Sequence, residues 1–207
     1  MARPLLQVSG LTRTFGTRPV VGPLDIALAQ GERVALVGPN GCGKTTVLRC
    51  VAGTLLPTTG QVQVGGHTAG SLATKHLVGA SLSQERSFYL RLSGHRNLLF
   101  FASLRHSLRR AAARQVRLIE DELEITEIAK NRMDRCSTGM LQQMSFARAL
   151  LGDPQLLLLD EPTRSLDTDA VARLWDAIDR RPYVAVLMAT HRQDDIPHCD
   201  DQIDLRA

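Results

Sequence analysis

Gly38-Pro39-Asn40-Gly41-Cys42-Gly43-Lys44-Thr45-Thr46 is the stretch that decides the fold of this chain. It follows an apolar run at residues 34–37 and precedes a segment of helical character at residues 45–51. The glycines let the backbone bend so that successive N–H groups point at phosphate oxygens. Lys44 adds a positive charge, the Thr45 hydroxyl is a ligand for Mg²⁺, and the helix directs its positive N-terminal end at the same phosphates. We therefore predict a phosphate-binding loop between a buried strand and a helix.

A second motif complements the loop. Four leucines at residues 156–159 are followed by Asp160-Glu161-Pro162. A buried strand delivers such carboxylates at its carboxyl end, where ligands bind in open α/β sheets. We expect Asp160 to hold Mg²⁺ beside Thr45, and Glu161 to accept a proton from the attacking water or to orient it. Alone, such a strand end also fits a helix-capping acid, but together with the loop it favours the second half of a phosphate-binding site.

Length and composition narrow the class of protein. The 207 residues suit one domain, and contents of 43% hydrophobic and 22% charged residues are ordinary for a globular chain. No apolar run approaches the roughly 20 residues that span a bilayer. Four scattered cysteines and the lack of a visible secretory signal favour a cytosolic location. A net charge of +4 with only 4% aromatic residues does not favour nucleic-acid binding.

Hydrophobic periodicity predicts alternating strands and helices. The expected strands are residues 6–11, 24–28, 33–37, 61–64, 77–82, 156–159, 184–189 and, as a last strand, 202–205. Residues 93–146 have mostly helical character, and a further helix is expected at residues 167–179. The continuous apolar strands suit a parallel sheet that is covered on both faces. We therefore predict an α/β fold with a helical insertion.

Further motifs occur in the same order as in a known protein family. Cys136-Ser137-Thr138-Gly139-Met140 resembles the Leu-Ser-Gly-Gly-Gln signature of the ATP-binding subunits of ABC transporters, although it keeps only Ser137 and Gly139. Residues 165–167 match that family's D-loop, His191 its switch histidine and Gln84 its Q-loop glutamine. The similarity covers nearly the whole chain, and around residues 86–101 the sequence is similar to ATPases of the ABC-2 exporter type.

The resemblance implies a complete architecture. It is that of a P-loop NTPase of the ABC type, with a mostly parallel core sheet, an N-terminal antiparallel β subdomain and an inserted α-helical subdomain. One ABC ATPase domain would occupy residues 1–207. Residues 1–84 and 152–207 would form its nucleotide-binding core, and residues from about 85 to 151 the helical subdomain with the signature. No carboxyl-terminal regulatory domain is expected.

The resemblance also assigns the site residues. Catalytic roles fall on Glu161, His191 and Gln84, and Mg²⁺ ligation on Thr45, Gln84 and Asp160. The residues that would bind ATP are Phe15, Gly38, Pro39, Asn40, Gly41, Cys42, Gly43, Lys44, Thr45, Thr46, Ser137 and Gly139. Two of these have a plainer interpretation: Phe15 would either stack on adenine or pack in the core, and Ser137 could be an ordinary helix cap.

The function implied by the resemblance is nucleotide-driven transport. Two cassettes, expected to be copies of this chain, would close head to tail around two Mg-ATP and drive integral-membrane permease subunits, without nucleic acid, at the cytoplasmic face of the plasma (inner) membrane. Phe88, Tyr89 and residues 96–101 would receive a short helix of the permease, or else merely pack the subdomain. Alternatives are a soluble non-transport ABC ATPase acting on ribosomes or DNA, a small-molecule kinase, and a cassette that only binds nucleotide.

Overall fold

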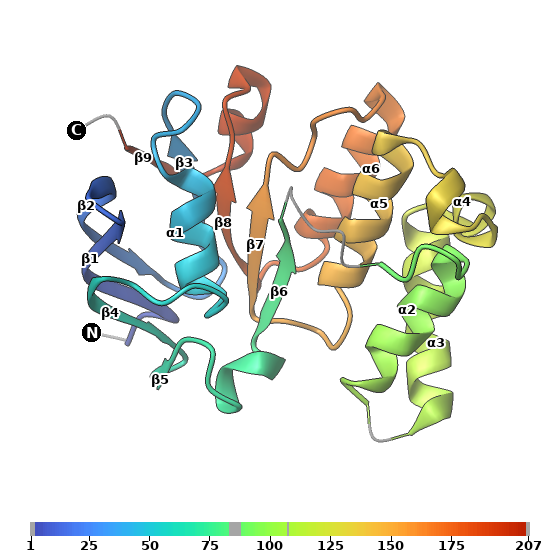
Figure 1. Cartoon of the computed structure of the whole chain (residues 1–207). Helices are drawn as coiled ribbons and strands as arrows, with labels where there is room; N and C mark the ends of the chain where they lie inside the picture. Colours follow the sequence, from blue (N-terminus) through green and yellow to red (C-terminus); the bar gives the residue numbers. More distant parts are fainter. Residues whose placement is uncertain (1–2, 83–87, 107, 206–207) are drawn as a thin grey trace.

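Two β-sheets enclose one helix, and a group of helices lies to one side (Figure 1). The computed structural model describes residues 3–82, 88–106 and 108–205. Helix α1 (Lys44–Val51) follows the phosphate-binding loop and packs against strands of both sheets. This arrangement covers the buried side of each sheet, because α1 buries Val47, Leu48 and Val51 between them.

The first sheet is antiparallel and runs in the order β2-β1-β4-β5. Its strands are β1 (Leu6–Phe15), β2 (Arg18–Leu28), β4 (Thr59–Val64) and β5 (His67–Thr68). Leu6, Val8 and Leu11 of β1 are fully buried. Their spacing changes at a bulge between Val8 and Leu11, where Gly10 has φ +57°. The bulge interrupts the alternation of buried and exposed residues, but β1 continues past it to residue 15. Strands β1 and β2 are therefore longer than the strands predicted at residues 6–11 and 24–28.

The second sheet is parallel throughout and has the order β6-β7-β8-β3-β9. Its strands are β3 (Arg33–Val37), β6 (Val78–Ser81), β7 (Leu156–Asp160), β8 (Ala185–Ala189) and β9 (Asp201–Asp204). Every residue of β7 and β8 is buried. The predicted parallel sheet is therefore confirmed, and the carboxyl ends of β3, β7 and β8 meet at one edge.

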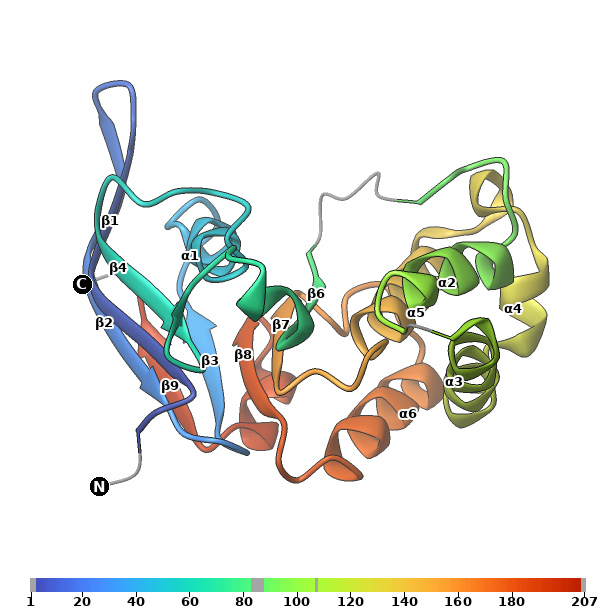
Figure 2. The same cartoon turned by 90° about the horizontal axis from the view of Figure 1, so that it is seen from below.

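The helical region begins after β6 and returns to the sheet at β7. It comprises α2 (Gly94–Ser103), α3 (Arg109–Glu122), α4 (Thr126–Lys130) and α5 (Thr138–Ala149), and Figure 2 shows it beside the sheets. Helix α6 (Thr168–Asp179) lies near α5, and short 3-10 turns occur at η1 (Ala73–His76), η2 (Met133–Arg135) and η3 (Gln193–His198). One apolar cluster joins these helices to one face of the parallel sheet, and a second fills the space around α1.

The described helices are short. The longest, α3, has 14 residues, and four of its first nine are charged. Within residues 3–82, 88–106 and 108–205, none has the length and apolar character that crossing a bilayer requires.

Candidate nucleotide-binding site

The phosphate-binding loop is held open by backbone geometry. Gly43, immediately before α1, has φ +106°, a conformation that side chains rarely adopt. A Cβ at Gly43 would also lie 2.7 Å from the carbonyl oxygen of Val20. Both constraints require glycine at this position, and α1 begins at the next residue, where the first N–H groups of a helix have no acceptor within the helix.

Lys44 lies inside the loop rather than in solvent. Its Nζ donates hydrogen bonds to the carbonyl oxygens of Gly38 at 2.6 Å and Pro39 at 3.1 Å, and the residue is only 7% exposed. An ammonium group has three donors, so these two carbonyls leave one for another acceptor. The loop thus holds a positive charge beside the N-terminus of α1, where a phosphate would be attracted by both.

Thr45 and Asp160 form the candidate metal centre. Thr45 Oγ1 donates a 2.9 Å hydrogen bond to Oδ2 of Asp160, which is the last residue of β7 and is 2% exposed. Mg²⁺ at nucleotide sites takes one or two protein oxygens and completes its shell with phosphate and water. A hydroxyl and a buried carboxylate at the phosphate-binding loop fit that requirement, so these two residues would hold the ion if it binds.

Glu161 and His191 meet next to the metal centre. Nδ1 of His191 lies 2.7 Å from Oε2 of Glu161, and the histidine side chain is half exposed while the glutamate is buried. Despite this short distance, Oε2 has no hydrogen-bond partner among the described residues. Glu161 adopts φ +51°, and its N–H donates to the carbonyl oxygen of Ala189 at 2.8 Å. A strained backbone with an unsatisfied buried carboxylate is typical of a functional position.

A cleft of about 570 Å³ joins these groups. Its lining includes Asn40, Gly41, Gly43, Lys44, Thr45, Thr46, Asp160, Glu161 and His191. Gly38 and Pro39 line a neighbouring cleft of about 470 Å³ that also contains His191. Cys42 lines neither cleft, because its sulfur turns back towards Gly38. The structure therefore brings most of the predicted residues together around His191.

Three arginines of the larger cleft were missed by the sequence reasoning. Arg18, Arg164 and Arg192 line it together with Val20. They come from the start of β2, the segment after Glu161 and the segment after His191. Arg164 and Arg192 could have been predicted because each lies within three residues of a predicted catalytic residue. Arg18 has no such neighbour in sequence, and only the pairing of β1 with β2 brings it to the site.

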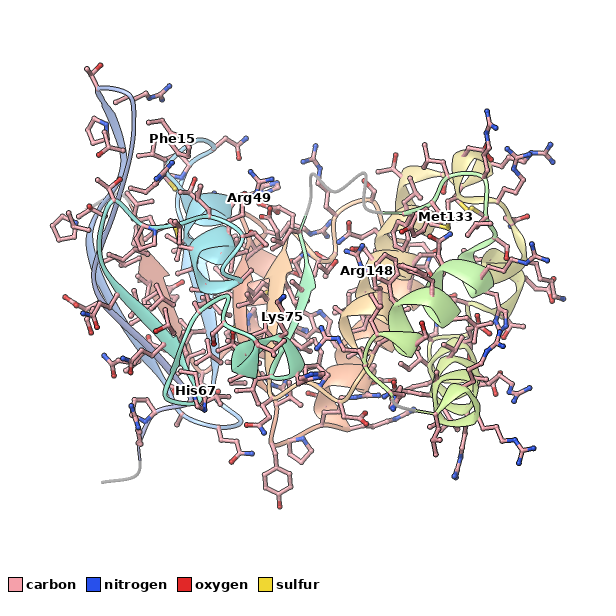
Figure 3. All side chains as sticks on the ribbon, turned by 60° about the horizontal axis from the view of Figure 1, so that its bottom comes forward. Phe15, Arg49, His67, Lys75, Met133 and Arg148 are labelled. Carbon is pink, nitrogen blue, oxygen red and sulfur yellow. The ribbon has the colours of Figure 1, made fainter. Side chains whose placement is uncertain are left out.

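Phe15 is exposed at the end of β1, beside the turn into β2 (Figure 3). It is 46% exposed, and the guanidinium of Arg13 lies 4.5 Å from the centre of its ring. The alternative of core packing is therefore wrong. Phe15 lines neither of the two clefts around His191, so its contact with adenine stays a prediction.

Ser137 and Gly139 lie at the start of α5 and line neither of these clefts. Ser137 is exposed, and its Oγ accepts a 3.2 Å hydrogen bond from the N–H of Met140, so it does cap the helix. A Cβ at Gly139 would lie 2.4 Å from the carbonyl oxygen of Ser165, which shows how closely α5 approaches the D-loop. The structure does not bring these two residues to the phosphate-binding loop of the same chain.

Gln84 lies outside the described residues, as do Glu85, Arg86 and Ser87 of the proposed docking segment. Phe88, for which the sequence left open contact with the permease or packing of the subdomain, is 9% exposed and belongs to the helical core, where its ring meets Phe101 edge-on. Its ring also lies 4.8 Å from the guanidinium of Arg148, so for Phe88 the structure supports the packing alternative.

The glycine-rich loop, the β7 carboxylates and the histidine after β8 define a P-loop nucleotide-binding protein. Comparison with known proteins specifies the class further: the model of the ABC transporter family matches residues 21–164, and the chain belongs to that family. It is 33% identical to the daunorubicin resistance ATP-binding protein DrrA3 of Streptomyces coeruleorubidus over 86% of this chain and 57% of DrrA3. It is 32% identical to the zinc import ATP-binding protein ZnuC of Roseobacter denitrificans over 96% of this chain and 74% of ZnuC.

A solved structure described as the ATP-binding subunit of an ABC transporter has the same fold. It superposes with a TM-score of 0.87 at 22% identity, covering 97% of this chain and 85% of the other. The chain spans between 57% and 66% of the length of DrrA3 and three other curated relatives. The family and the fold of this ATP-binding domain are therefore established.

Proposed function

We propose that this chain binds Mg-ATP and hydrolyses it, and that it powers an ABC exporter whose membrane-spanning part is formed by separate permease subunits. The observation that carries the proposal is the geometry at the carboxyl ends of β7 and β8. There Asp160 contacts Thr45 at 2.9 Å, and Glu161 lies 2.7 Å from His191. An ion pair that only stabilises the fold would account for the contact between Glu161 and His191, but it would not explain why that contact lies beside a phosphate-binding loop.

Each of these groups has a defined task in hydrolysis. Lys44 and the N–H groups at the start of α1 would bind the β- and γ-phosphates. Thr45 and Asp160 would hold Mg²⁺, which would supply positive charge against the phosphate oxygens. Glu161, whose Oε2 has no hydrogen-bond partner among the described residues, would orient the attacking water and take its proton. His191, beside it, would donate a hydrogen bond to the γ-phosphate, and Gln84 would contact the metal and the water.

The exposed signature supports a paired arrangement. Ser137 and Gly139 stand outside the cleft of their own chain, so they are available to the nucleotide of a second copy. In the pair, two clefts would each take the phosphate-binding loop of one protomer and the signature of the other. ATP then stabilises the closed pair because its γ-phosphate contacts both protomers, and hydrolysis removes that bridge.

A surface for the permease is proposed on the helical region. Tyr89 is 51% exposed and packs edge-on against Phe100, which is 39% exposed. Nearby, a cleft of about 510 Å³ separates η1 from α2 and contains Phe101, Leu104 and Arg105. Apolar side chains around a cleft are suited to a short amphipathic helix. Binding there would place this chain at the cytoplasmic face of the plasma membrane.

Export rather than import is supported by the local sequence of residues 86–101 and by the similarity to DrrA3, whose name refers to drug resistance, which export of the drug would explain. The similarity to ZnuC shows that overall identity does not decide direction. The ribosome- or DNA-associated alternative finds no support in the comparisons. We propose no nucleic-acid partner, in keeping with a net charge of only +4.

Phosphate release from Mg-ATP, measured without any acceptor substrate, tests the proposed activity. The purified chain should hydrolyse ATP, whereas a kinase would wait for its acceptor. Glu161→Gln should bind ATP with little change but lose at least about 100-fold in turnover, and it should accumulate as an ATP-dependent dimer in size-exclusion chromatography. Wild-type turnover in Glu161→Gln would refute the assigned role. Recovery of the native complex with ribosomes instead of a membrane protein would refute the transport function.

A further inference from the structure

A buried carboxylate behind the site connects the two loops that carry Glu161 and His191. Asp195, in the first turn of η3, is 1% exposed. Thr163 Oγ1 donates to its Oδ1 at 2.8 Å, and Thr190 Oγ1 donates to its Oδ2 at 2.6 Å. Both hydroxyl-bearing residues are themselves buried, at 1% and 0% exposure. Asp195 lines neither of the clefts around His191, so a nucleotide bound in them would not contact it.

The two threonines are placed next to the proposed catalytic pair. Thr163 follows Glu161 by two residues, and Thr190 immediately precedes His191. The Thr190 hydroxyl also accepts a 3.0 Å hydrogen bond from the N–H of Arg192, so the backbone on both sides of His191 is fixed through one oxygen. The hydrogen bond from the N–H of Glu161 to Ala189 joins the same two loops a second time.

A carboxylate is an unusual choice for this interior position. Burying an acidic group is unfavourable unless hydrogen bonds replace its hydration, and a hydrophobic residue would usually fill the space as well. Here the two donors to Asp195 come from two separate loops, so the carboxylate sets their distance from each other. The contact of 2.7 Å between His191 and Glu161 depends on that distance, and catalytic groups must be held to within about 0.5 Å of their working geometry.

We propose that Asp195 is a positioning residue for ATP hydrolysis, which acts through Thr163 and Thr190 to hold Glu161 and His191 in register. This inference rests on the proposed hydrolytic function. It predicts a defect in the chemical step and not in nucleotide affinity, because the groups that bind phosphate belong to the loop at residues 38–46 and do not contact Asp195.

The test compares single-group changes in the purified chain. Thr190→Val removes the hydroxyl at nearly constant volume, and Asp195→Ala removes the shared acceptor. Each should lower kcat for phosphate release by about 10–100-fold, while the Kd for Mg-ADP by calorimetry stays within about twofold. Thr190→Ser keeps the hydroxyl and should restore most of kcat. In the Asp195→Ala background, Thr190→Val should have little further effect, because both changes break the same link.

Asp194→Asn is the matched control. Asp194 is the neighbouring acid of η3, its side chain is 85% exposed, and its ion pair with Arg192 is a surface contact at 3.3 Å. This variant should turn over ATP as the wild type does. Circular dichroism with thermal melting distinguishes a misfolded variant from a folded variant with a catalytic defect. If Asp195→Ala does not fold, the comparison of kcat between Thr190→Val and Thr190→Ser still tests the role of Asp195.

Three results would overturn the inference. The first is a kcat of Thr190→Val within about twofold of wild type. The second is a loss of kcat in Thr190→Ser equal to that in Thr190→Val, and the third is a rise in the Kd for Mg-ADP parallel to the fall in kcat. The Glu161→Gln variant distinguishes failure of the proposed function from failure of the role of Asp195. If that variant hydrolyses normally, the proposed function fails; if it is inactive while Thr190→Val is unaffected, only the role of Asp195 fails.

Discussion

Thr45 at the start of α1 and Asp160 at the end of β7 are 115 positions apart in sequence, yet Thr45 Oγ1 donates a 2.9 Å hydrogen bond to Asp160 Oδ2. The contact exists because β3 and β7 both border β8 in the parallel sheet and end at the same edge. It brings a neutral and an anionic oxygen ligand together beside the phosphate-binding loop.

Thr45→Val should therefore impair Mg²⁺ binding more than nucleotide binding. The substitution keeps the volume but removes the ligand oxygen, so the Mg²⁺ concentration for half-maximal ATPase activity should rise by at least about tenfold. A Mg²⁺ titration of phosphate release measures this directly. Thr45→Ser retains the hydroxyl and serves as the control. An unchanged Mg²⁺ requirement in Thr45→Val would remove Thr45 from the metal centre.

Gly139→Ala should destabilise the junction of α5 with the D-loop. The new Cβ would lie 2.4 Å from the carbonyl oxygen of Ser165, a distance that real structures avoid, so one of the two segments must shift. We expect a loss of about 1–3 kcal/mol in the free energy of unfolding, measured by urea denaturation. Gly22→Ala is the control, because a Cβ at Gly22 meets no atom within 4 Å. Equal stability of the two variants would contradict the close packing.

Phe15→Ala should weaken ATP binding if the exposed ring stacks on adenine. Aromatic stacking contributes about 0.5–1.5 kcal/mol, which corresponds to a rise in Kd of about two- to twelvefold. Phe15→Tyr should preserve the affinity. Tyr183→Ala removes a ring that is 74% exposed before the amino end of β8, away from the site, and should leave the Kd unchanged. Equilibrium titration with ATP in the absence of Mg²⁺ provides the measurement, and wild-type affinity in Phe15→Ala would exclude the stacking role.

Phe88 and Tyr89 are adjacent but should respond differently to truncation. Phe88 is buried against Phe101, so Phe88→Ala should cost about 3–5 kcal/mol in the free energy of unfolding. Tyr89 is half exposed, so Tyr89→Ala should cost about 1 kcal/mol or less. Tyr89→Ala should instead lower the yield of membrane-bound complex while ATP binding persists. A complex of normal yield would remove Tyr89 from the docking surface.

Alkylation of Cys199 should be slow and should depend steeply on pH. Burial, followed by repulsion from Asp195 and Asp200, raises the pKa of this thiol to about 11. Because the thiolate is the reactive form, the rate of modification by iodoacetamide should rise about tenfold per pH unit from pH 8 to pH 10. In urea Cys199 should react as an ordinary thiol. Mass spectrometry locates the adduct, and fast modification of the folded protein at pH 8 would contradict the burial.

The same raised pKa has a consequence for stability. The folded state retains the proton of Cys199 more tightly than the unfolded chain does. The stabilisation associated with it is complete below the unfolded pKa and is lost as the pH rises from there towards 11. Replacement of Cys199 by Ala should therefore reduce the loss of thermal stability between pH 8 and pH 10.

The local elements of the site, and the family, were predictable from the order of the amino acids alone. The loop from Gly38 to Thr46, the strand before Asp160 and the strand before His191 were all predictable, because glycine spacing and uninterrupted apolar runs act over a few residues. The parallel sheet followed from the same runs, since only strands covered on both faces are apolar at every position.

Which side chains from distant segments meet became visible only in the folded chain. The burial of Phe88 beside the exposed Tyr89, the arrival of Arg18 at the phosphate cleft and the joining of Thr163 to Thr190 by Asp195 have no local signal. Each depends on the order of strands in a sheet or on the packing of a helix across it. Neighbours in sequence fix the conformation of a segment, whereas distances between segments arise only when the sheet assembles and the cores around it close.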